Sequence, residues 1–97
     1  MEIDKIKGYL NISHKAGYLI AGGEKLKDYN KKLYLVIYDK LAQKNTMKIV
    51  DKLKEKSIYV VEVGNLEELV SIKNCKIIGL KNKNLSEIIL NLIKNKE

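Results

Sequence analysis

The stretch AGYLIAGGEKLKD at residues 16–28 decides the fold, and it holds three of the six glycines in the chain. An apolar triplet runs into Gly22 and Gly23, and a short lysine-bearing helical pattern follows, which predicts a strand, a glycine turn and a helix start. Glycines at such a junction let backbone N–H groups approach a ligand, most commonly phosphate. A plain turn that needs glycine for its dihedral angles explains the same residues, so both interpretations stay open.

The rest of the chain alternates between helical and strand patterns. We expect helices over 4–16, 24–29, 42–55 and 66–70 and an amphipathic final helix from Leu85 to Ile93, with strands over 19–21, 33–38, 57–63 and 75–80. Asn45 and Thr46 are the expected caps of the third helix, and Asn84 and Ser86 those of the last. The alternation predicts an α/β/α sandwich, a small sheet with helices on both faces.

The net charge of the chain indicates which classes of molecule it could bind. The 97 residues suit a single domain, and the formal net charge is +7, with all 19 basic residues being lysine. A small basic domain of this kind is typical of nucleic-acid binders, although a lysine- and asparagine-rich genome gives the same composition without any ligand. Lysine lacks the bidentate fork of arginine, so contacts to a nucleic-acid backbone are favoured over readout of base edges.

The sequence contains few residues of the types that catalytic and metal sites use. The chain has one cysteine, Cys75, and one histidine, His14, which predicts no internal disulfide, no metal site and no cofactor. Gly22-Gly23 matches neither a P-loop nor a full dinucleotide fingerprint, so an enzyme that binds a nucleotide there is the least favoured interpretation. Asp39 fits better as a residue at the start of a helix and Cys75 as a small buried hydrophobe, and we expect no catalytic residues.

The sequence also predicts no targeting signal. The polar, charged start predicts no secretory signal, and no apolar run approaches the ~18 residues of a membrane span. We therefore expect a cytoplasmic protein that has no membrane partner.

Several segments, in order, resemble one known family. The run KAGYLIAG at 15–22 resembles the R-A-G-K-L-V-S-G segment of small bacterial YlxQ-like proteins, which belong to the kink-turn RNA-binding family of ribosomal proteins L-seven-Ae and L-thirty-e. Residues 32–39 resemble K-L-V-L-I-A-x-D, residues 45–52 resemble N-T-x-K-K-I-x-D-K, residues 58–63 resemble V-P-V-x-x-V, and residues 66–69 resemble x-x-E-L-G. The resemblance implies a three-layer α/β/α sandwich with a four-stranded mixed sheet. It also implies a non-enzymatic protein that binds structured, possibly ribosomal, RNA.

The implied RNA contacts lie on the glycine turn, the helix after it and the loop before the last strand. In the family motif G-x-N-E-x-x-K, Gly22 takes the glycine position, whereas Glu24 falls at the asparagine, Lys25 at the glutamate and Asp28 at the lysine, or Lys27 does so after a gap. The loop at 70–76 lacks the usual L-G-x-A-x-G pattern. RNA is therefore better supported as a ligand class than a kink-turn is as the specific target.

The sequence therefore predicts one RNA-binding site and leaves one alternative function open. The expected RNA-binding residues are Lys15, Gly22, Gly23, Glu24, Lys25, Lys27, Asp28, Lys31, Ile72 and Lys73. We do not expect DNA as a partner. The alternative is a protein-interaction module on the same fold, which has lost kink-turn recognition and docks a partner helix or a second copy of itself.

Overall fold

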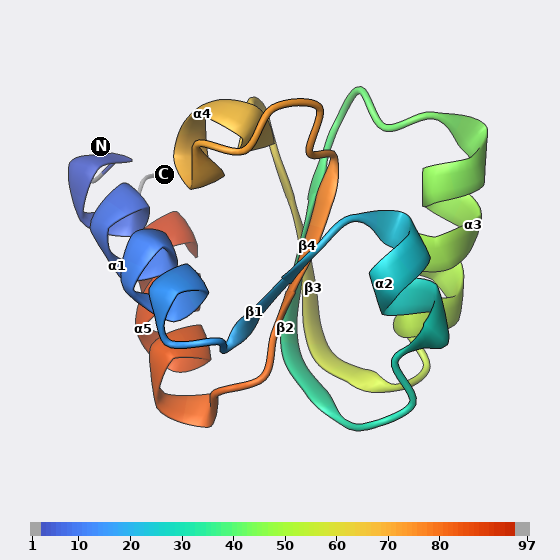
Figure 1. Ribbon diagram of the computed structural model, residues 1–97, viewed down its shortest axis with the longest axis horizontal. Helices are drawn as coiled ribbons and strands as arrows, with labels where there is room; N and C mark the ends of the chain where they lie inside the picture. The colour runs from blue at the N-terminus through green and yellow to red at the C-terminus, as the bar shows by residue number, and fades with distance from the viewer. Residues whose placement is uncertain (1–2, 95–97) are drawn as a thin grey trace.

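Four strands form one mixed sheet in the order β1-β4-β2-β3 in the computed structural model, which describes residues 3–94 (Figure 1). The strands are β1 (Leu19–Ala21), β2 (Leu33–Asp39), β3 (Ser57–Val63) and β4 (Ile77–Leu80). Strand β4 runs antiparallel to both neighbours, and β2 and β3 are parallel. The carboxyl ends of β1, β2 and β3 therefore share one edge of the sheet with the start of β4.

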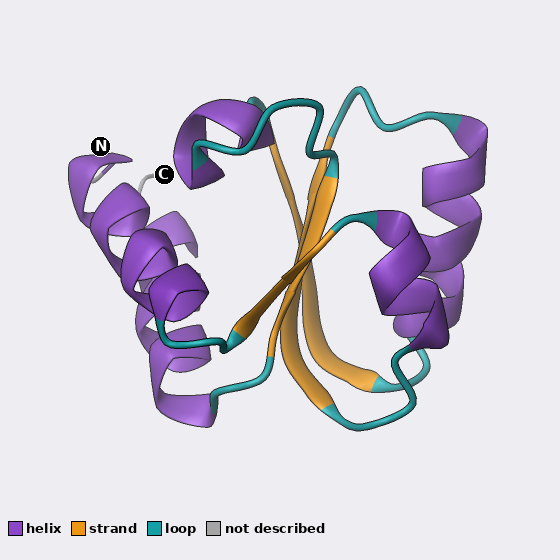
Figure 2. Ribbon diagram, in the orientation of Figure 1, coloured by secondary structure: helices purple, strands orange, loops and turns teal. Residues whose placement is uncertain are grey.

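Helices cover both faces of this sheet (Figure 2). The helices α1 (Ile3–Lys15), α4 (Leu66–Val70) and α5 (Lys83–Lys94) pack on one face, and α2 (Gly23–Asp28) and α3 (Lys44–Leu53) pack on the other. The fold is thus a three-layer α/β/α sandwich with a four-stranded mixed sheet, as the sequence predicted. None of the helices between residues 3 and 94 is long and apolar enough to cross a membrane.

Two buried clusters fill the spaces between these layers. The larger cluster joins Ile6 and Leu10 of α1 and Ile89 of α5 to the sheet, together with α4. The smaller cluster contains Leu26 of α2 and Val50 and Leu53 of α3, packed on the opposite face. Strands β2 and β4 are almost wholly buried because both clusters use them, as a continuously apolar strand predicts.

Glycine sets the geometry of the chain at two of these contacts. Gly17 follows α1 with a φ of 78°, the left-handed conformation of a helix C-cap, and its N–H donates to the His14 carbonyl at 3.2 Å. Gly79 lies in β4 under α2, where a Cβ would come within 2.6 Å of the Leu26 Cδ2 atom and 3.3 Å of Leu33. Only glycine at position 79 lets α2 approach the sheet this closely.

Two predicted helix starts are wrong. Helix α3 begins at Lys44 after Gln43, which makes no side-chain capping bond, so Asn45 and Thr46 lie inside the first turn. The α5 start is capped by Asn82, whose side-chain oxygen accepts from the Leu85 N–H at 2.9 Å, whereas Ser86 is buried in the helix. An asparagine just before a helix competes well for the cap, and Asn82 stands two residues before the predicted candidate Asn84.

Two predicted lengths are also corrected. Helix α3 spans Lys44–Leu53 rather than 42–55, and β4 spans Ile77–Leu80 rather than 75–80. In both cases the predicted element included loop residues that carry side chains compatible with the neighbouring pattern. Helix α5 is longer than predicted, from Lys83 to Lys94 rather than from Leu85 to Ile93, and each remaining element differs from its predicted range by at most one residue at either end.

Candidate functional site

Three loops meet at the edge of the sheet where β1 and β2 end and β4 begins. They are the turn from β1 into α2, the loop from β2 into α3 and the loop from α4 into β4, drawn in teal in Figure 2. Together they surround a depression of about 360 Å³, which we call the glycine-turn hollow. It is lined by Gly22, Gly23, Leu41, Gln43, Thr46, Asn74, Lys76 and Ile77.

Gly22 and Gly23 of the hollow differ in what a side chain at each position would meet. Gly22 has a φ of 98°, where an L side chain is strained, and its N–H donates to the Ile77 carbonyl at 3.0 Å, which ties the turn to β4. A Cβ at Gly23 would lie 2.8 Å from the Ile49 Cδ1 atom of α3. The fold therefore needs glycine at position 22 for its backbone conformation, whereas a side chain at position 23 would have to displace the end of the Ile49 side chain, and the space around a Cβ at Gly22 is open.

Asp39, at the end of β2, holds the loops of this edge together. Its carboxylate accepts from the Leu41 N–H at 2.8 Å and from the Leu66 N–H of α4 at 3.0 Å, and it lies 3.9 Å from the Lys76 ammonium. Burial raises the pKa of the Asp39 carboxyl, but the two hydrogen bonds and the charges of Lys76 and Lys40 outweigh it, so this pKa lies below its ordinary value. Asp39 is therefore a buried structural anion, and Lys76 is the cation held beside it.

The loop from α4 into β4 is also fixed by polar contacts. Ser71 ends α4 in the left-handed region with a φ of 57°, and Asn74 adopts a φ of 61°. The Glu67 carboxylate accepts from the Asn74 N–H, which anchors the loop to α4. Cys75 is buried, and burial raises the pKa of its thiol, which donates to the Ile77 carbonyl at 3.5 Å. The thiol is thus a protonated core group, whereas a reactive cysteine needs thiolate character.

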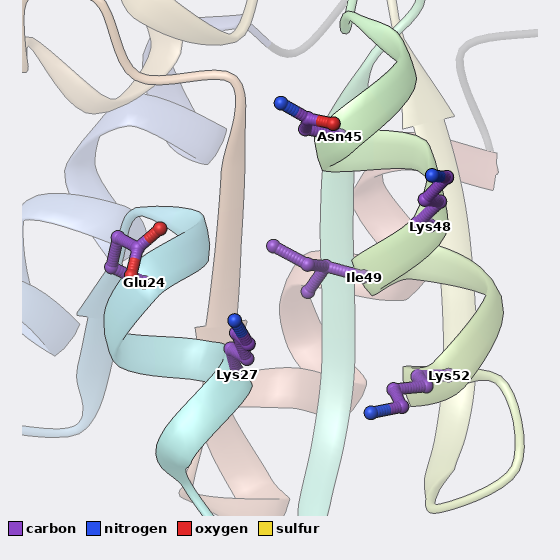
Figure 3. A pocket seen from close by; sticks show the side chains of 6 residues that line it. All are labelled: Glu24, Lys27, Asn45, Lys48, Ile49 and Lys52. Atoms are coloured by element: carbon purple, nitrogen blue, oxygen red, sulfur yellow. The ribbon is translucent and has the colours of Figure 1, made fainter.

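A second depression, which we call the lysine groove, runs between α2 and α3. It has a volume of about 410 Å³ and is lined by Glu24, Lys27, Asn45, Lys48, Ile49 and Lys52. Figure 3 shows Lys27 on α2 facing α3, with the Ile49 side chain reaching toward α2 from the other wall. Three of the six lining residues are cations and one is an anion, whereas the hollow has Lys76 as its one charged lining residue. Positive charge is thus concentrated in the groove rather than in the hollow.

The structure brings only part of the predicted RNA site together. Gly22 and Gly23 line the hollow, and Glu24 and Lys27 line the groove. Lys25 and Asp28 are exposed on α2 and line neither. Lys15 precedes β1, at the opposite end of that strand from Gly22, and Lys31 follows the far end of α2.

The second predicted loop contributes different residues from those expected. Ile72 is half-buried and packs against the larger cluster, and Lys73 is exposed and does not line the hollow. Asn74 and Lys76 line the hollow instead, because β4 begins directly after them. Sequence reasoning included both residues in the loop but did not single them out, since their facing depends on the left-handed residue at 74.

Sequence reasoning also missed the cations of α3. Lys44, Lys48 and Lys52 recur at intervals of four residues, a spacing that places side chains on one face of a helix. This periodic signal was available before the structure. Its meaning was not, because only the packing of α2 beside α3 makes Lys48 and Lys52 walls of a groove.

Metal ligands are not clustered in the described part of the chain. Between residues 3 and 94, no group of three or more His, Cys, Asp or Glu side chains is placed to hold a metal ion.

Comparison with known proteins finds a similar solved structure whose function is unknown. No protein-family model and no curated protein matches the chain. The fold is similar to that of a solved protein of unknown function from Bacillus halodurans C, with a TM-score of 0.78 and 29% sequence identity. The similarity covers 93% of this chain and 97% of the other, so it extends over the whole sandwich.

Proposed function

We propose that this protein is a non-enzymatic RNA-binding protein that holds structured RNA at the glycine-turn hollow. The observation that carries the proposal is the meeting of the β1–α2 turn and the α4–β4 loop at one hollow. These are the two segments that the resemblance to the L-seven-Ae and L-thirty-e family implies for RNA. A chain in which they lay apart would have given no support to that resemblance.

The chemistry of the hollow suits an unpaired nucleotide. Gln43 and Asn74 carry amides that both donate and accept hydrogen bonds, as a base edge requires. Lys76 supplies a point charge for a phosphate, and the exposed Leu41 side chain offers apolar surface to a base. The positive net charge of the chain adds a salt-dependent attraction that does not depend on sequence.

The proposal concerns RNA of irregular structure, such as loops and bulges, rather than a regular duplex. Unpaired bases can be splayed into a hollow and contacted on their edges, whereas the deep groove of an RNA duplex hides them. A kink-turn remains one candidate within this class. The changed residues at Glu24, Lys25 and Asp28 give no support for the base contacts that the family motif makes.

Cross-linking in cells followed by sequencing of the bound RNA, and then filter binding of the recovered fragments, tests the proposal. Replacing Lys76→Gln is expected to lower affinity and to reduce the slope of log affinity against log salt by about one. Lys81→Gln is the matched control, because Lys81 follows the same strand at the opposite edge of the sheet and is also half-buried.

Two results would overturn the proposal. One is wild-type protein that shows no salt-sensitive binding of the fragments at micromolar concentration. The other is equal affinity loss in the Lys76 and Lys81 variants. A dimer in light scattering that buries the hollow would instead favour the protein-interaction module.

A further inference from the structure

We infer that the lysine groove carries the phosphate backbone of an RNA strand that continues from the hollow, independently of base sequence. The inference rests on the proposed function and extends it. It assigns the RNA a second contact region between α2 and α3, and the family resemblance implies no RNA contact on α3.

The groove and the hollow adjoin each other. Gly23 lines the hollow, and its Cβ position lies 2.8 Å from the Cδ1 atom of Ile49, which lines the groove. Along α3, Thr46 lines the hollow and its neighbour Asn45 lines the groove. A strand that leaves the hollow over Gly23 therefore enters the groove directly.

The lysines of the groove are arranged as a row. Lys48 and Lys52 are one turn apart on α3, with Lys44 a turn earlier, so their attachment points follow one another at about 6 Å along the helix axis. This interval is comparable to the spacing of successive phosphates along a strand. A smaller depression continues past Lys27 and Lys52 to Lys56, beyond the end of α3.

The lysines of the row have no ion-pair partner among the described residues. Like charges one turn apart on a helix repel each other, and among residues 3–94 neither Lys48 nor Lys52 forms an ion pair. The carboxylates near the row are Glu24, on the α2 wall, Glu55, in the smaller depression, and Asp51, which lies 3.7 Å from the Lys54 ammonium. A polyanion lying in the groove reduces the repulsion, and Asn45, at the end next to the hollow, is the one lining residue whose amide side chain could read a base edge.

The partner chemistry follows from the residue types. Lysines bind phosphates as point charges and release the counterions that surround a nucleic-acid strand. The groove is therefore expected to bind oligouridine and oligoadenosine equally well. A contact with bases would discriminate between them.

The test compares double variants of the full chain with equal charge change. Lys48→Gln with Lys52→Gln removes the row, and Lys83→Gln with Lys94→Gln removes two exposed lysines from α5 on the opposite face. Binding of labelled oligouridine and oligoadenosine of about 12 nucleotides is followed by fluorescence anisotropy between about 50 and 200 mM salt. Lys48→Arg with Lys52→Arg keeps the charge and serves as the rescue.

The groove variant is expected to reduce the salt slope by about 1.4, from about 0.7 for each single-strand phosphate contact, on both RNAs alike. The α5 variant and the arginine variant are expected to keep the wild-type slope. If the groove and α5 variants have equal salt slopes, the groove does not contact the RNA strand. In that case, wild-type binding that is weakened by Lys76→Gln would still support the hollow as an RNA site. The same variants are also titrated with inorganic polyphosphate. If the groove variant loses polyphosphate binding and keeps RNA binding, RNA is not the occupant of the groove.

Discussion

The two faces of the sheet differ in how completely helices cover them. The face under α1, α4 and α5 carries the larger buried cluster, which includes residues from all three helices. The face under α2 and α3 carries the smaller one, and a groove stays open between its two helices. The comparison suggests a division of labour, in which the first face supplies most of the stability and the second supplies the surface for a ligand.

Leu10→Ala tests the stabilising face and has the largest expected effect. Leu10 is 1% exposed in the larger cluster, so the lost methyl groups and the cavity should lower the free energy of unfolding by about 2–5 kcal/mol. Urea denaturation measures the loss. RNA affinity of the folded protein should not change, because Leu10 lies on the face away from the hollow and the groove.

Ile12→Ala is the control on the same helix, since Ile12 is 53% exposed and should change stability by less than about 0.5 kcal/mol. Equal losses in the two variants would remove the basis for assigning stability to that face.

Asp39→Asn tests the residue that joins the two faces. Its carboxylate receives one N–H from the loop that leads to α3 and one from α4, and an amide NH₂ would oppose one of these donors. We expect a loss of about 1.5–3 kcal/mol at neutral pH. Because the pKa of Asp39 is lowered by folding, its stabilising contribution is present above the ordinary carboxyl pKa and is lost as pH falls through the folded value.

Denaturation of wild type and variant across the acid range measures this pH dependence. The difference between the two should shrink below about pH 4. Asp51→Asn, at an exposed position of α3, is the control and should change the free energy of unfolding at neutral pH by less than about 0.5 kcal/mol. A gap between wild type and the Asp39 variant that stays constant into strong acid would contradict the role given to the charge.

Gly79→Ala tests the ligand face and has the smallest expected effect. The added Cβ would collide with Leu26 and Leu33, and such overpacking typically costs about 1–3 kcal/mol. Because Leu26 holds α2 on the sheet, the same substitution should also weaken RNA binding at the groove. Thermal unfolding and anisotropy measure the two effects.

Gly8→Ala provides a control of opposite sign. Gly8 lies within α1 with nothing within 4 Å of its Cβ position, so alanine there should stabilise the protein by about 0.5–1 kcal/mol. A Gly79→Ala protein as stable as the Gly8 variant would show that α2 can move without cost.

The sequence predicted the fold better than it predicted the site. Alternating apolar patterns and the glycine turn were sufficient for the sandwich, because layer packing follows from the order of elements. Part of the hollow could be predicted, since Gly22 and Gly23 stand out in the sequence. Lys76 did not stand out, because its place beside Asp39 is set by β4 pairing with β2, residues far apart in the chain.

The lysines show even more clearly that the site could not be predicted in full from the sequence. Lys15, Lys25 and Lys31 lie close to the glycine turn in the sequence and are predicted to contact phosphate, yet none of the three lines either depression. Lys48 and Lys52 are more than twenty residues from that turn and reach its neighbourhood because α3 packs beside α2. Distance along the chain is a poor guide to charge clustering in a sandwich with crossover connections.

The position of β4 has a consequence for how the protein is made. It is the last strand in the sequence, yet it lies between β1 and β2 and pairs with both. During synthesis from the amino terminus, β1 has no partner strand until residues 77–80 leave the ribosome. The hollow, which needs the Gly22–Ile77 bond, therefore forms only after residue 77 is free to pair with β1 and β2.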